Sequence, residues 1–382
     1  MHHDRRRVKR SPLRVMFVVQ GEGRGHLTQA IAAKEILIQS GHTVSPVVVS
    51  TGMSRAIPDF FCKEFAGLHR ILSFRFAYAQ QRHIAWVRTY LWNALRLGRI
   101  VDGLLRLDRL MRESRPDVVV GFFEPLVGLH QLLFPPRAPA LTIAHQYMIW
   151  HPSYPRLKRY STQHFGLKLL AAAAGYGCAR VALSLYQTAE GGFDRTIVCP
   201  PLMRSQVRNM RPNRGDFLLV YLLQRGYLED IVRWHESHPE VLLHCFYDRS
   251  DSDDTAEDAT LKLHGIDGDL FLSMMARCRG VACTGGFETV SEAAYLGKPL
   301  MMVPVPDYYE QHLNSLDAQR LGLGKQSERF DLDRLLSMQP VARVVRGWFD
   351  RTPEILLHAV ESTAGRVRLH RRYADTGTGA SR

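Results

Sequence analysis

GVACTGGFETVSEAAYLGKPLMMVPVP, residues 280–306, is the stretch that decides the fold. It begins with a short apolar run ending at Cys283, which predicts a buried strand. Gly285 and Gly286 form a turn after this strand, and the pattern of residues 287–295 predicts a helix. Another apolar run follows. Strand, glycine turn, helix and strand in this order are typical of a parallel α/β sheet.

The rest of the chain repeats this alternation of short apolar runs and helical patterns. A segment rich in Pro, Arg and Asn interrupts it, and we interpret this segment as a linker. The sequence thus predicts an α/β protein of two doubly wound, Rossmann-like domains that face a central cleft, where such sheets bind ligands. The predicted strands span residues 14–19, 44–49, 117–121, 140–144, 181–184, 217–222, 241–246, 280–283 and 299–303. The predicted parts are a basic tail (1–13), an N-terminal domain (14–200), the linker (201–215), a C-terminal domain (216–345), a helical segment (346–370) and a disordered tail (371–382).

The formal net charge of +13 on this 382-residue chain is concentrated at its ends. Residues 1–10 and 366–382 each carry five Lys or Arg against one Asp, so the tails hold eight of the thirteen charges. The remaining charge suits an anionic small molecule, a membrane surface or simple solubility. No nucleic-acid motif accompanies it, so we predict no nucleic-acid partner.

The cysteine pattern and the hydropathy bear on the compartment. Six cysteines without a CxxC pair predict a reduced, cytoplasmic protein without structural zinc. No apolar run reaches the roughly 18 residues that a transmembrane helix needs. We therefore expect a protein that does not span a membrane.

A first glycine-rich loop lies near the N-terminus, in MFVVQGEGRGHLTQAIAAKEIL, residues 16–37. Gly23 and Gly25 allow close approach of a ligand to the start of the helix that follows. This loop is not a dinucleotide fingerprint, because His26 stands where the third glycine is needed and the second strand ends in Ser50 without an acidic residue. It is no P-loop either. His26 is a candidate general base that the positive helix end would keep neutral, or alternatively a capping or packing residue.

The helix after Gly286 offers a second site. Its first turn presents free N–H donors and a positive dipole end to a diphosphate. Glu292 lies deeper in this helix and can bind two vicinal hydroxyls, such as those of a ribose. Glu288 is the competing carboxylate, but in the first turn it would crowd the phosphates. The alternative is that Glu292 belongs to a solvated helix face.

These residues resemble a known family. GEGRGH, TGGFETVSEAAYLGKPLMMVP and YYEQHLNS look like the GT-B glycosyltransferases, particularly the family 28 branch with the peptidoglycan N-acetylglucosaminyltransferase and its uncharacterised relatives. The resemblance covers residues 14–325 and is most specific over 280–320. It implies a GT-B fold, a hexosyl- or N-acetylhexosaminyltransferase, and a nucleotide sugar donor, UDP-linked, held mainly by the C-terminal half.

The resemblance also implies roles for single residues. The glycine pair and Phe287 would hold the diphosphate, and Glu292 the ribose. Glu310 and Gln311 would contact the sugar, with Asn314 behind them. The family commonly has two glutamines at these positions, so the identity of the sugar stays open. Residues 262–267 would clamp the nucleobase, and Arg225 is a second cation for phosphate. The predicted donor site comprises Thr284, Gly285, Gly286, Phe287, Glu288, Glu292, Glu310, Gln311 and Arg225.

Polar residues after two strands of the first half define the acceptor side. Glu124, His145 and Gln146 should face the same cleft as His26, Gly23 and Gly25. Either His26 or Glu124 could accept a proton from an acceptor hydroxyl, and we rank His26 first. The alternative for Glu124 is a cap on the neighbouring helix.

Residues 85–115 combine leucines at helical spacing with Trp86, Tyr90 and Trp92 and with the arginines Arg88, Arg96, Arg99, Arg106, Arg109 and Arg112. This pattern predicts peripheral contact with anionic lipid at the inner face of a membrane, near a lipid-linked acceptor or cell-envelope glycan precursor. A core-packed helix with a solvated basic side is the alternative.

The predicted reaction is an inverting transfer of a sugar to a hydroxyl acceptor without a cofactor or metal. No carboxylate pair follows a strand, and the acidic stretch at 250–258 is interpreted as an exposed loop. Two other functions fit the same pocket: a non-hydrolysing nucleotide-sugar epimerase, and an inactive nucleotide-sugar-binding regulatory protein.

Overall fold

The structure is a computed structural model of the chain. It describes residues 11–51, 56–74, 78–79, 83–84, 95–188, 191–223, 225–248, 258–340 and 345–375. For residues 78–79, 83–84, 225 and 366–375 it describes the backbone only.

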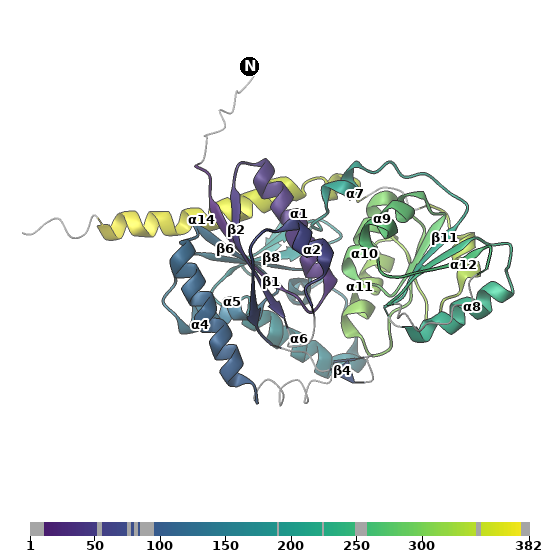
Figure 1. The fold of residues 1–382 in the computed structure, drawn as a ribbon, viewed down its shortest axis with the longest axis horizontal. Helices are drawn as coiled ribbons and strands as arrows, with labels where there is room; N and C mark the ends of the chain where they lie inside the picture. The colour runs from purple at the N-terminus through teal and green to yellow at the C-terminus, as the bar shows by residue number, and fades with distance from the viewer. Residues whose placement is uncertain are drawn as a thin grey trace, which may run out of the picture.

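The first half of the described chain forms an eight-stranded sheet in the order β3-β2-β1-β6-β7-β8-β10-β9 (Figure 1). Its strands are parallel except for β9, which runs antiparallel to β10. The bounds are β1 (Arg14–Gln20), β2 (Thr43–Thr51), β3 (Leu68–Leu72), β6 (Val118–Phe122), β7 (Ala140–Ala144), β8 (Ala179–Leu183), β9 (Gly192–Phe193) and β10 (Thr196–Cys199). A separate small hairpin pairs β4 (Tyr78–Ala79) with β5 (His83–Ile84). The helices are α1 (Arg24–Gln39), α2 (Asp59–Glu64), α4 (Leu97–Ser114), α5 (Pro125–Leu133), η1 (His145–Trp150), η2 (Lys158–Tyr160) and α6 (Ser161–Ala174).

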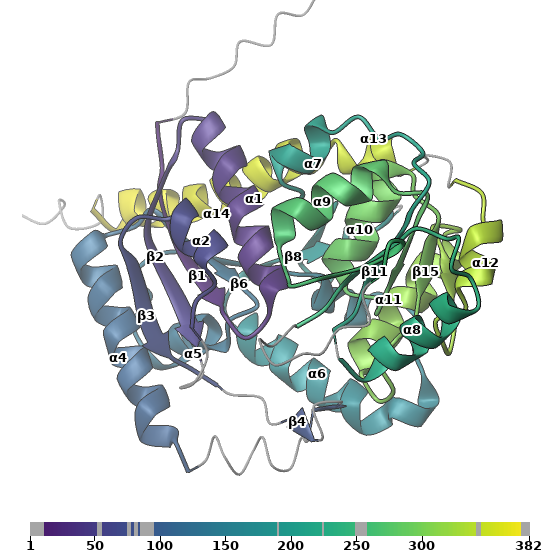
Figure 2. The ribbon, with the colours of Figure 1, turned by 45° about the vertical axis from the view of Figure 1, so that its right-hand side comes forward.

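The second half forms a six-stranded, fully parallel sheet in the order β13-β12-β11-β14-β15-β16 (Figure 2). Its strands are β11 (Leu218–Tyr221), β12 (Leu243–Phe246), β13 (Leu261–His264), β14 (Gly280–Cys283), β15 (Leu300–Met302) and β16 (Lys325–Gln326). The helices are α7 (Ser205–Asn209), η3 (Arg225–Tyr227), α8 (Leu228–Glu236), α9 (Gly268–Arg277), α10 (Phe287–Leu296), α11 (Tyr309–Arg320), α12 (Leu332–Ser337), α13 (Arg346–Phe349) and α14 (Thr352–Asp375).

Alternate side chains of the central strand β1 enter two layers of helices. Val15, Phe17 and Val19 pack in the same core as residues of α1 and α14, whereas Met16 and Val18 pack with residues of α4 and α5. All five side chains are fully buried. A strand that is covered on both faces reads as a continuous apolar run, which is why this strand could be predicted from the sequence.

The C-terminal helix α14 returns to the first half of the molecule (Figure 1). Its first residue, Thr352, donates a hydrogen bond to the carbonyl of Pro201 (3.1 Å), and Trp348 donates to the carbonyl of Ser184 (3.0 Å). Leu356 and Ala359 are fully buried in the core that contains β1. The chain therefore begins and ends its described part on the same sheet.

Each of the nine predicted runs contains an observed strand, with ends shifted by at most a few residues. The prediction missed β3, β9, β10, β13 and β16, which lie toward the edges of the two sheets, and both strands of the hairpin β4–β5. Such strands carry polar side chains, as in LKLH of β13, and so lack a continuous apolar run. No helix in the described ranges is long and apolar enough to cross a bilayer.

Both sheets reverse their strand order beside their first strand, at β1/β6 and at β11/β14. In open parallel sheets this reversal opens a crevice at the carboxyl ends of the two strands. The loops there are those before α1 and α5 in one sheet, and those before α8 and α10 in the other. The topology therefore predicts that a ligand binds at these four loops.

Candidate active site

The turn before α10 has the geometry that only glycine readily adopts. Gly285 has a φ of +82°, and a Cβ there would collide with Oγ of Ser315 on α11. Asn314 of the same helix donates a hydrogen bond to the carbonyl of Gly285 (3.2 Å). Gly286 is the N-cap, and a Cβ on it would meet open space. The turn is thus fixed from behind by α11, and the space beside Gly286 is open, as a site for an anion at the start of a helix requires.

Glu292 is buried on α10 and has a cationic neighbour that the sequence did not suggest. Its Oε1 lies 3.4 Å from a guanidinium nitrogen of Arg204, in the predicted linker. Burial raises the pKa of Glu292 to about 7, although Arg204 acts in the opposite direction. A second nitrogen of Arg204 lies 3.9 Å from Asp269. Glu292 therefore does not belong to a solvated helix face.

Glu288 points toward the first half of the molecule. One of its carboxylate oxygens accepts a hydrogen bond from Nε2 of Gln29 on α1. The other would lie 2.5 Å from a Cβ at position 25, so Gly25 makes room for this carboxylate. The predicted donor residue Glu288 thus lies beside the predicted acceptor-side loop.

His26 is the third residue of α1 and is buried at the same junction. Its Nδ1 lies 3.2 Å from Oε1 of Gln29, and its ring packs 5.6 Å from the ring of Phe123. Burial lowers the pKa of His26, while the carboxylates of Glu288 and Glu310 act to raise it. A neutral imidazole is the form that can accept a proton.

Glu124 is fully buried and serves as the N-cap of α5. Its carboxylate accepts hydrogen bonds from the backbone N–H of Leu126 (3.1 Å) and from the hydroxyls of Ser50 and Ser73. Burial raises the pKa of Glu124, although these three donors oppose the shift. These contacts are those of the capping alternative, and the role of Glu124 as a base remains a prediction.

His145 and Glu310 join the two halves at a second point. The ring of His145, at the start of η1, stacks on Phe287 at 4.4 Å, and its Nε2 lies 3.1 Å from Oε1 of Glu310. Gln146 donates a hydrogen bond to the other oxygen of Glu310 (3.3 Å). Burial acts to raise the pKa of Glu310, but these partners outweigh it and lower the pKa. Four predicted residues from three distant segments thus meet here.

Gln311 is buried and holds the loop after β15. Its side-chain oxygen accepts a hydrogen bond from the backbone N–H of Val305 (2.9 Å). The contact of Gln311 with the donor sugar remains a prediction. Thr284, at the end of β14, is also buried.

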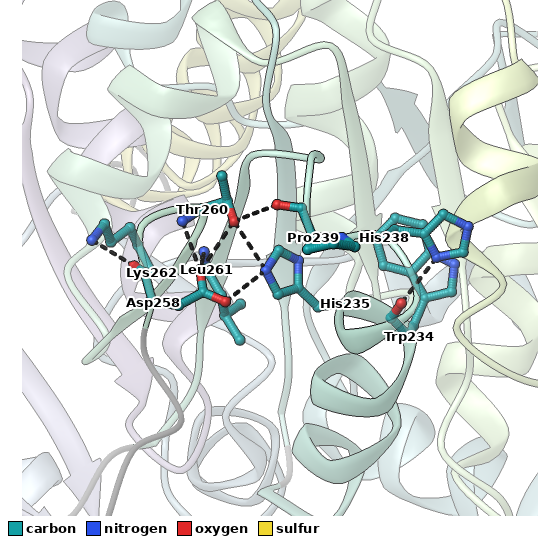
Figure 3. A network of polar contacts seen from close by, with 8 residues as sticks. All are labelled: Trp234, His235, His238, Pro239, Asp258, Thr260, Leu261 and Lys262. Atoms are coloured by element: carbon teal, nitrogen blue, oxygen red, sulfur yellow. Dashed lines mark hydrogen bonds and ion pairs between the residues drawn. The ribbon is translucent and has the colours of Figure 1, made fainter.

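The predicted nucleobase segment begins on the edge strand β13, which a polar network anchors (Figure 3). Oδ1 of Asp258 accepts hydrogen bonds from the backbone N–H groups of Thr260 (2.7 Å) and Leu261 (2.6 Å). These two hydrogen bonds lower the pKa of Asp258 to about 2. Its Oδ2 lies 3.1 Å from Nε2 of the buried His235 on α8. The network fixes the start of the strand that leads to residues 262–267.

Three other predictions concern segments that are described only in part. The side chain of Arg225 lies outside the described residues, as do residues 85–94 with their aromatic side chains and residues 250–257 of the acidic stretch. In the part of the chain that is described, no group of three or more His, Cys, Asp or Glu could hold a metal ion. Metal independence remains a prediction.

The described part of residues 85–115 is mainly α4, and it has two apolar faces. Ile100, Leu104, Leu107 and Met111 are buried against the sheet, as the core-packed alternative expects. Other apolar side chains of the same helix are exposed: Leu97 (61%), Val101 (45%) and Leu105 (51%). Core packing and an exposed apolar line therefore coexist on this helix.

The sequence profile of glycosyl transferase family 1 matches residues 13–344, from the start of β1 to beyond β16. The chain belongs to this family. It is therefore a glycosyltransferase, as the sequence predicted. A search of curated protein sequences found no match.

Solved structures of glycosyltransferases resemble this glycosyltransferase over nearly its whole length. CalG4, the calicheamicin glycosyltransferase, has a TM-score of 0.56 and 18% identity, covering 94% of this chain and 100% of its own. MurG from Acinetobacter baumannii has a TM-score of 0.50 and 16% identity, covering 94% and 100%. A UDP-glucosyltransferase from Polygonum tinctorium has a TM-score of 0.58 and 13% identity, covering 92% and 94%.

At these identities the likeness concerns the fold. It confirms the predicted GT-B arrangement of two doubly wound halves and the resemblance to the GT-B glycosyltransferases, MurG among them. The family whose profile matches is family 1, so the narrower link to family 28 remains a prediction.

Proposed function

We propose that this glycosyltransferase moves a sugar from a UDP-linked donor to a hydroxyl acceptor, with inversion at the anomeric carbon. One observation supports this most. The glycine-opened helices α1 and α10 meet at the junction of the two halves, where Gln29 is hydrogen-bonded to Glu288. A candidate base and a candidate diphosphate site then lie on opposite sides of one reacting centre.

The donor side is proposed to use the first turn of α10. Its backbone N–H groups and helix dipole would stabilise the two phosphates, and more strongly as charge develops on the leaving diphosphate. Glu292 would accept hydrogen bonds from the ribose hydroxyls, and Arg204 beside it would hold the carboxylate in place. The likeness in fold to a UDP-glucosyltransferase supports UDP as the nucleotide.

The acceptor side is proposed to use His26. The acceptor oxygen forms a bond to the anomeric carbon while the bond from that carbon to the diphosphate oxygen breaks. The acceptor proton passes to Nε2 of His26, and the electron pair of the broken bond leaves with the diphosphate. One displacement of this kind inverts the anomeric centre.

The proposal is tested by ligand binding and by one catalytic variant. A thermal-shift screen should show stabilisation by UDP and UDP-sugars but not by NAD or ATP, because ligand that binds only the folded state raises its stability. His26→Ala should leave the affinity for UDP unchanged and lower transfer roughly 10²–10⁴-fold, the usual contribution of a general base. Stabilisation by NAD or ATP alone would contradict the donor assignment.

The two other functions predict different products. An epimerase would convert a UDP-sugar without a second substrate, whereas a transferase releases UDP faster when an acceptor extract is added. A regulatory binding protein would bind UDP-sugars equally well with and without His26, and neither form would give a product.

We also propose that the acceptor side lies against an anionic membrane at its inner face. Supporting this, the exposed Leu97, Val101 and Leu105 follow one another at four-residue spacing on α4, and Arg106 and Arg109 are exposed beside them. Helix α6, which contacts α5 as α4 does, exposes Phe165 (62%) and Leu169 (46%). Apolar side chains flanked by arginines are suited to the interface of an anionic bilayer.

A further inference from the structure

A chain of two contacts links His26 to the opposite half of the molecule. Nδ1 of His26 lies 3.2 Å from Oε1 of Gln29, one turn further along α1. Nε2 of Gln29 donates a hydrogen bond to Oε1 of Glu288, on the first turn of α10. The Gln29 side chain therefore bridges the candidate base and a carboxylate 259 positions away in the sequence.

The direction of these hydrogen bonds follows from their chemistry. An ionised carboxylate can only accept, so the end of Gln29 that faces Glu288 is its NH₂ group. The end that faces His26 is then the carbonyl oxygen, which also can only accept. Nδ1 of His26 must therefore carry the hydrogen. In the neutral ring, Nε2 is left with the lone pair that a general base needs.

The carboxylate of Glu288 is also well placed to accept the hydrogen bond from Gln29 as an anion. It lies in the first turn of α10, where the helix dipole favours a negative charge. Its second oxygen lies so close to Gly25 that a Cβ there would come within 2.5 Å of it. The absence of a side chain at Gly25 therefore leaves room for the carboxylate of Glu288.

Glu124 is not the residue that contacts Nδ1 of His26. A carboxylate that orients the base is common in catalytic sites with a histidine base. Here the oxygens of Glu124 accept hydrogen bonds from Ser50, Ser73 and the backbone of Leu126. The observed partner of His26 is an uncharged amide, whose orientation is fixed from the other half of the molecule.

We infer that Gln29 is a positioning residue that sets the tautomer of His26, and that Glu288 sets the orientation of Gln29. The inference rests on the proposed role of His26 as the base. The lone pair is then presented only when the two halves meet as in this structure. The other titratable groups that act on His26 are Glu310 and His145.

The tautomer can be measured without any substrate. In protein labelled with ¹⁵N-histidine, NMR distinguishes the protonated from the unprotonated ring nitrogen, and His26 is assigned as the signal missing from His26→Gln. We expect a protonated Nδ1 and an unprotonated Nε2 in the wild type. Gln29→Ala should change this tautomer population, whereas Gln39→Ala, at an exposed position of the same helix, should not. A proton on Nε2 in the wild type, or an unchanged signal in Gln29→Ala, would overturn the inference.

A swapped pair separates positioning from general structural support. Gln29→Glu alone places two carboxylates together. Gln29→Glu with Glu288→Gln restores both hydrogen bonds, because the carboxylate introduced at position 29 accepts from Nδ1 and from the amide introduced at position 288. The double variant should recover the wild-type tautomer, and Glu288→Leu should not. We call the contacts from Glu288 through Gln29 to His26 the relay. If the double variant does not recover the tautomer although circular dichroism shows that it is folded, the result would count against the relay.

An activity measurement then connects the relay to the reaction. Release of UDP from UDP-glucose or UDP-N-acetylglucosamine should fall roughly 10–100-fold in Gln29→Ala, less than the roughly 10²–10⁴-fold effect of losing the base itself, and its pH profile should shift. Recovery in the double variant is expected. Should the tautomer respond as expected while His26→Ala leaves UDP release unchanged, the proposed function would fail but the relay would stand. A large loss in His26→Ala with none in Gln29→Ala would refute the relay alone.

Discussion

Two glutamates on neighbouring turns of α10 illustrate how much the environment decides at the scale of a single residue. Glu288 meets an amide donor from α1, whereas Glu292, one turn further on, is buried beside Arg204. The sequence ranked them by position in the helix alone. Their partners, however, come from α1 and from the segment between the two sheets.

The pKa of Glu292 leads to a prediction for nucleotide binding. Ribose hydroxyls donate to an ionised carboxylate, so UDP affinity should rise with pH until Glu292, with a pKa of about 7, is ionised. Between pH 6 and pH 8 we expect the affinity measured by calorimetry to rise about tenfold, the effect of one coupled proton.

Glu292→Gln is the control in this experiment. The variant should bind UDP more weakly at pH 8. It should also lose the pH dependence that comes from ionisation of Glu292, and keep only the pH dependence that comes from ionisation of UDP itself. An identical pH dependence in wild type and Glu292→Gln would argue that Glu292 does not contact the ribose.

The same carboxyl also affects folding. Its pKa in the folded protein lies above its usual value, so the folded state holds more protons than the unfolded state between those two values. The contribution of Glu292 to stability is therefore most favourable at low pH and declines as the pH rises toward 7. A buried carboxylate retained at this cost is consistent with a functional role.

At the scale of the element, α4 carries apolar side chains on two faces. Its buried side packs on the sheet, while Leu97, Val101 and Leu105 are exposed. A helix that only completes a core has little reason to expose a continuous apolar line.

Val101→Glu tests the membrane contact of α4. Vesicles of phosphatidylcholine with phosphatidylglycerol should bind the wild type more strongly than vesicles of phosphatidylcholine alone, as measured by co-sedimentation. The variant should bind the anionic vesicles at least about tenfold more weakly, since burial of one valine side chain contributes about 1.5–3 kcal/mol.

Gln39→Glu adds the same charge at an exposed position of α1 and serves as the matched control. It should lower vesicle binding far less than Val101→Glu does. Equal losses in the two variants would attribute the effect to net charge and count against a contact through α4.

At the scale of the whole molecule, α14 connects the end of the chain to the first sheet. It follows the second sheet in sequence, yet Leu356, Ala359 and Val360 are fully buried with residues of the first half. Trp348 and Thr352 hold its entry by hydrogen bonds to Ser184 and Pro201. The helix thereby limits how the two halves can separate.

Leu356→Ala should lower the free energy of unfolding by roughly 2–5 kcal/mol, the usual cost of removing a buried leucine. Urea unfolding would measure this. Glu354→Ala, with a side chain 75% exposed on the same helix, should change the free energy by less than about 0.5 kcal/mol. Similar small changes in both variants would show that α14 contributes little to stability.

The sequence by itself determined the local units. The buried strands β1 and β14, the turn at Gly285 and the helix after it follow from apolar runs and from glycine, whose effects act within a few residues. The expected N-cap geometry before Pro125 is of the same kind, and Glu124 is indeed the cap. The resemblance to the GT-B glycosyltransferases also followed from local motifs.

Tertiary structure alone decided which of these units meet. Arg204 and Glu292 are 88 positions apart, and Gln29 and Glu288 are 259 apart. No local pattern marks Arg204 or Gln29, since each is an ordinary polar residue until the fold places a carboxylate beside it. Hydrogen bonds and burial act over a few ångströms of space rather than of sequence, so the partners and protonation states of this site are properties of the folded chain.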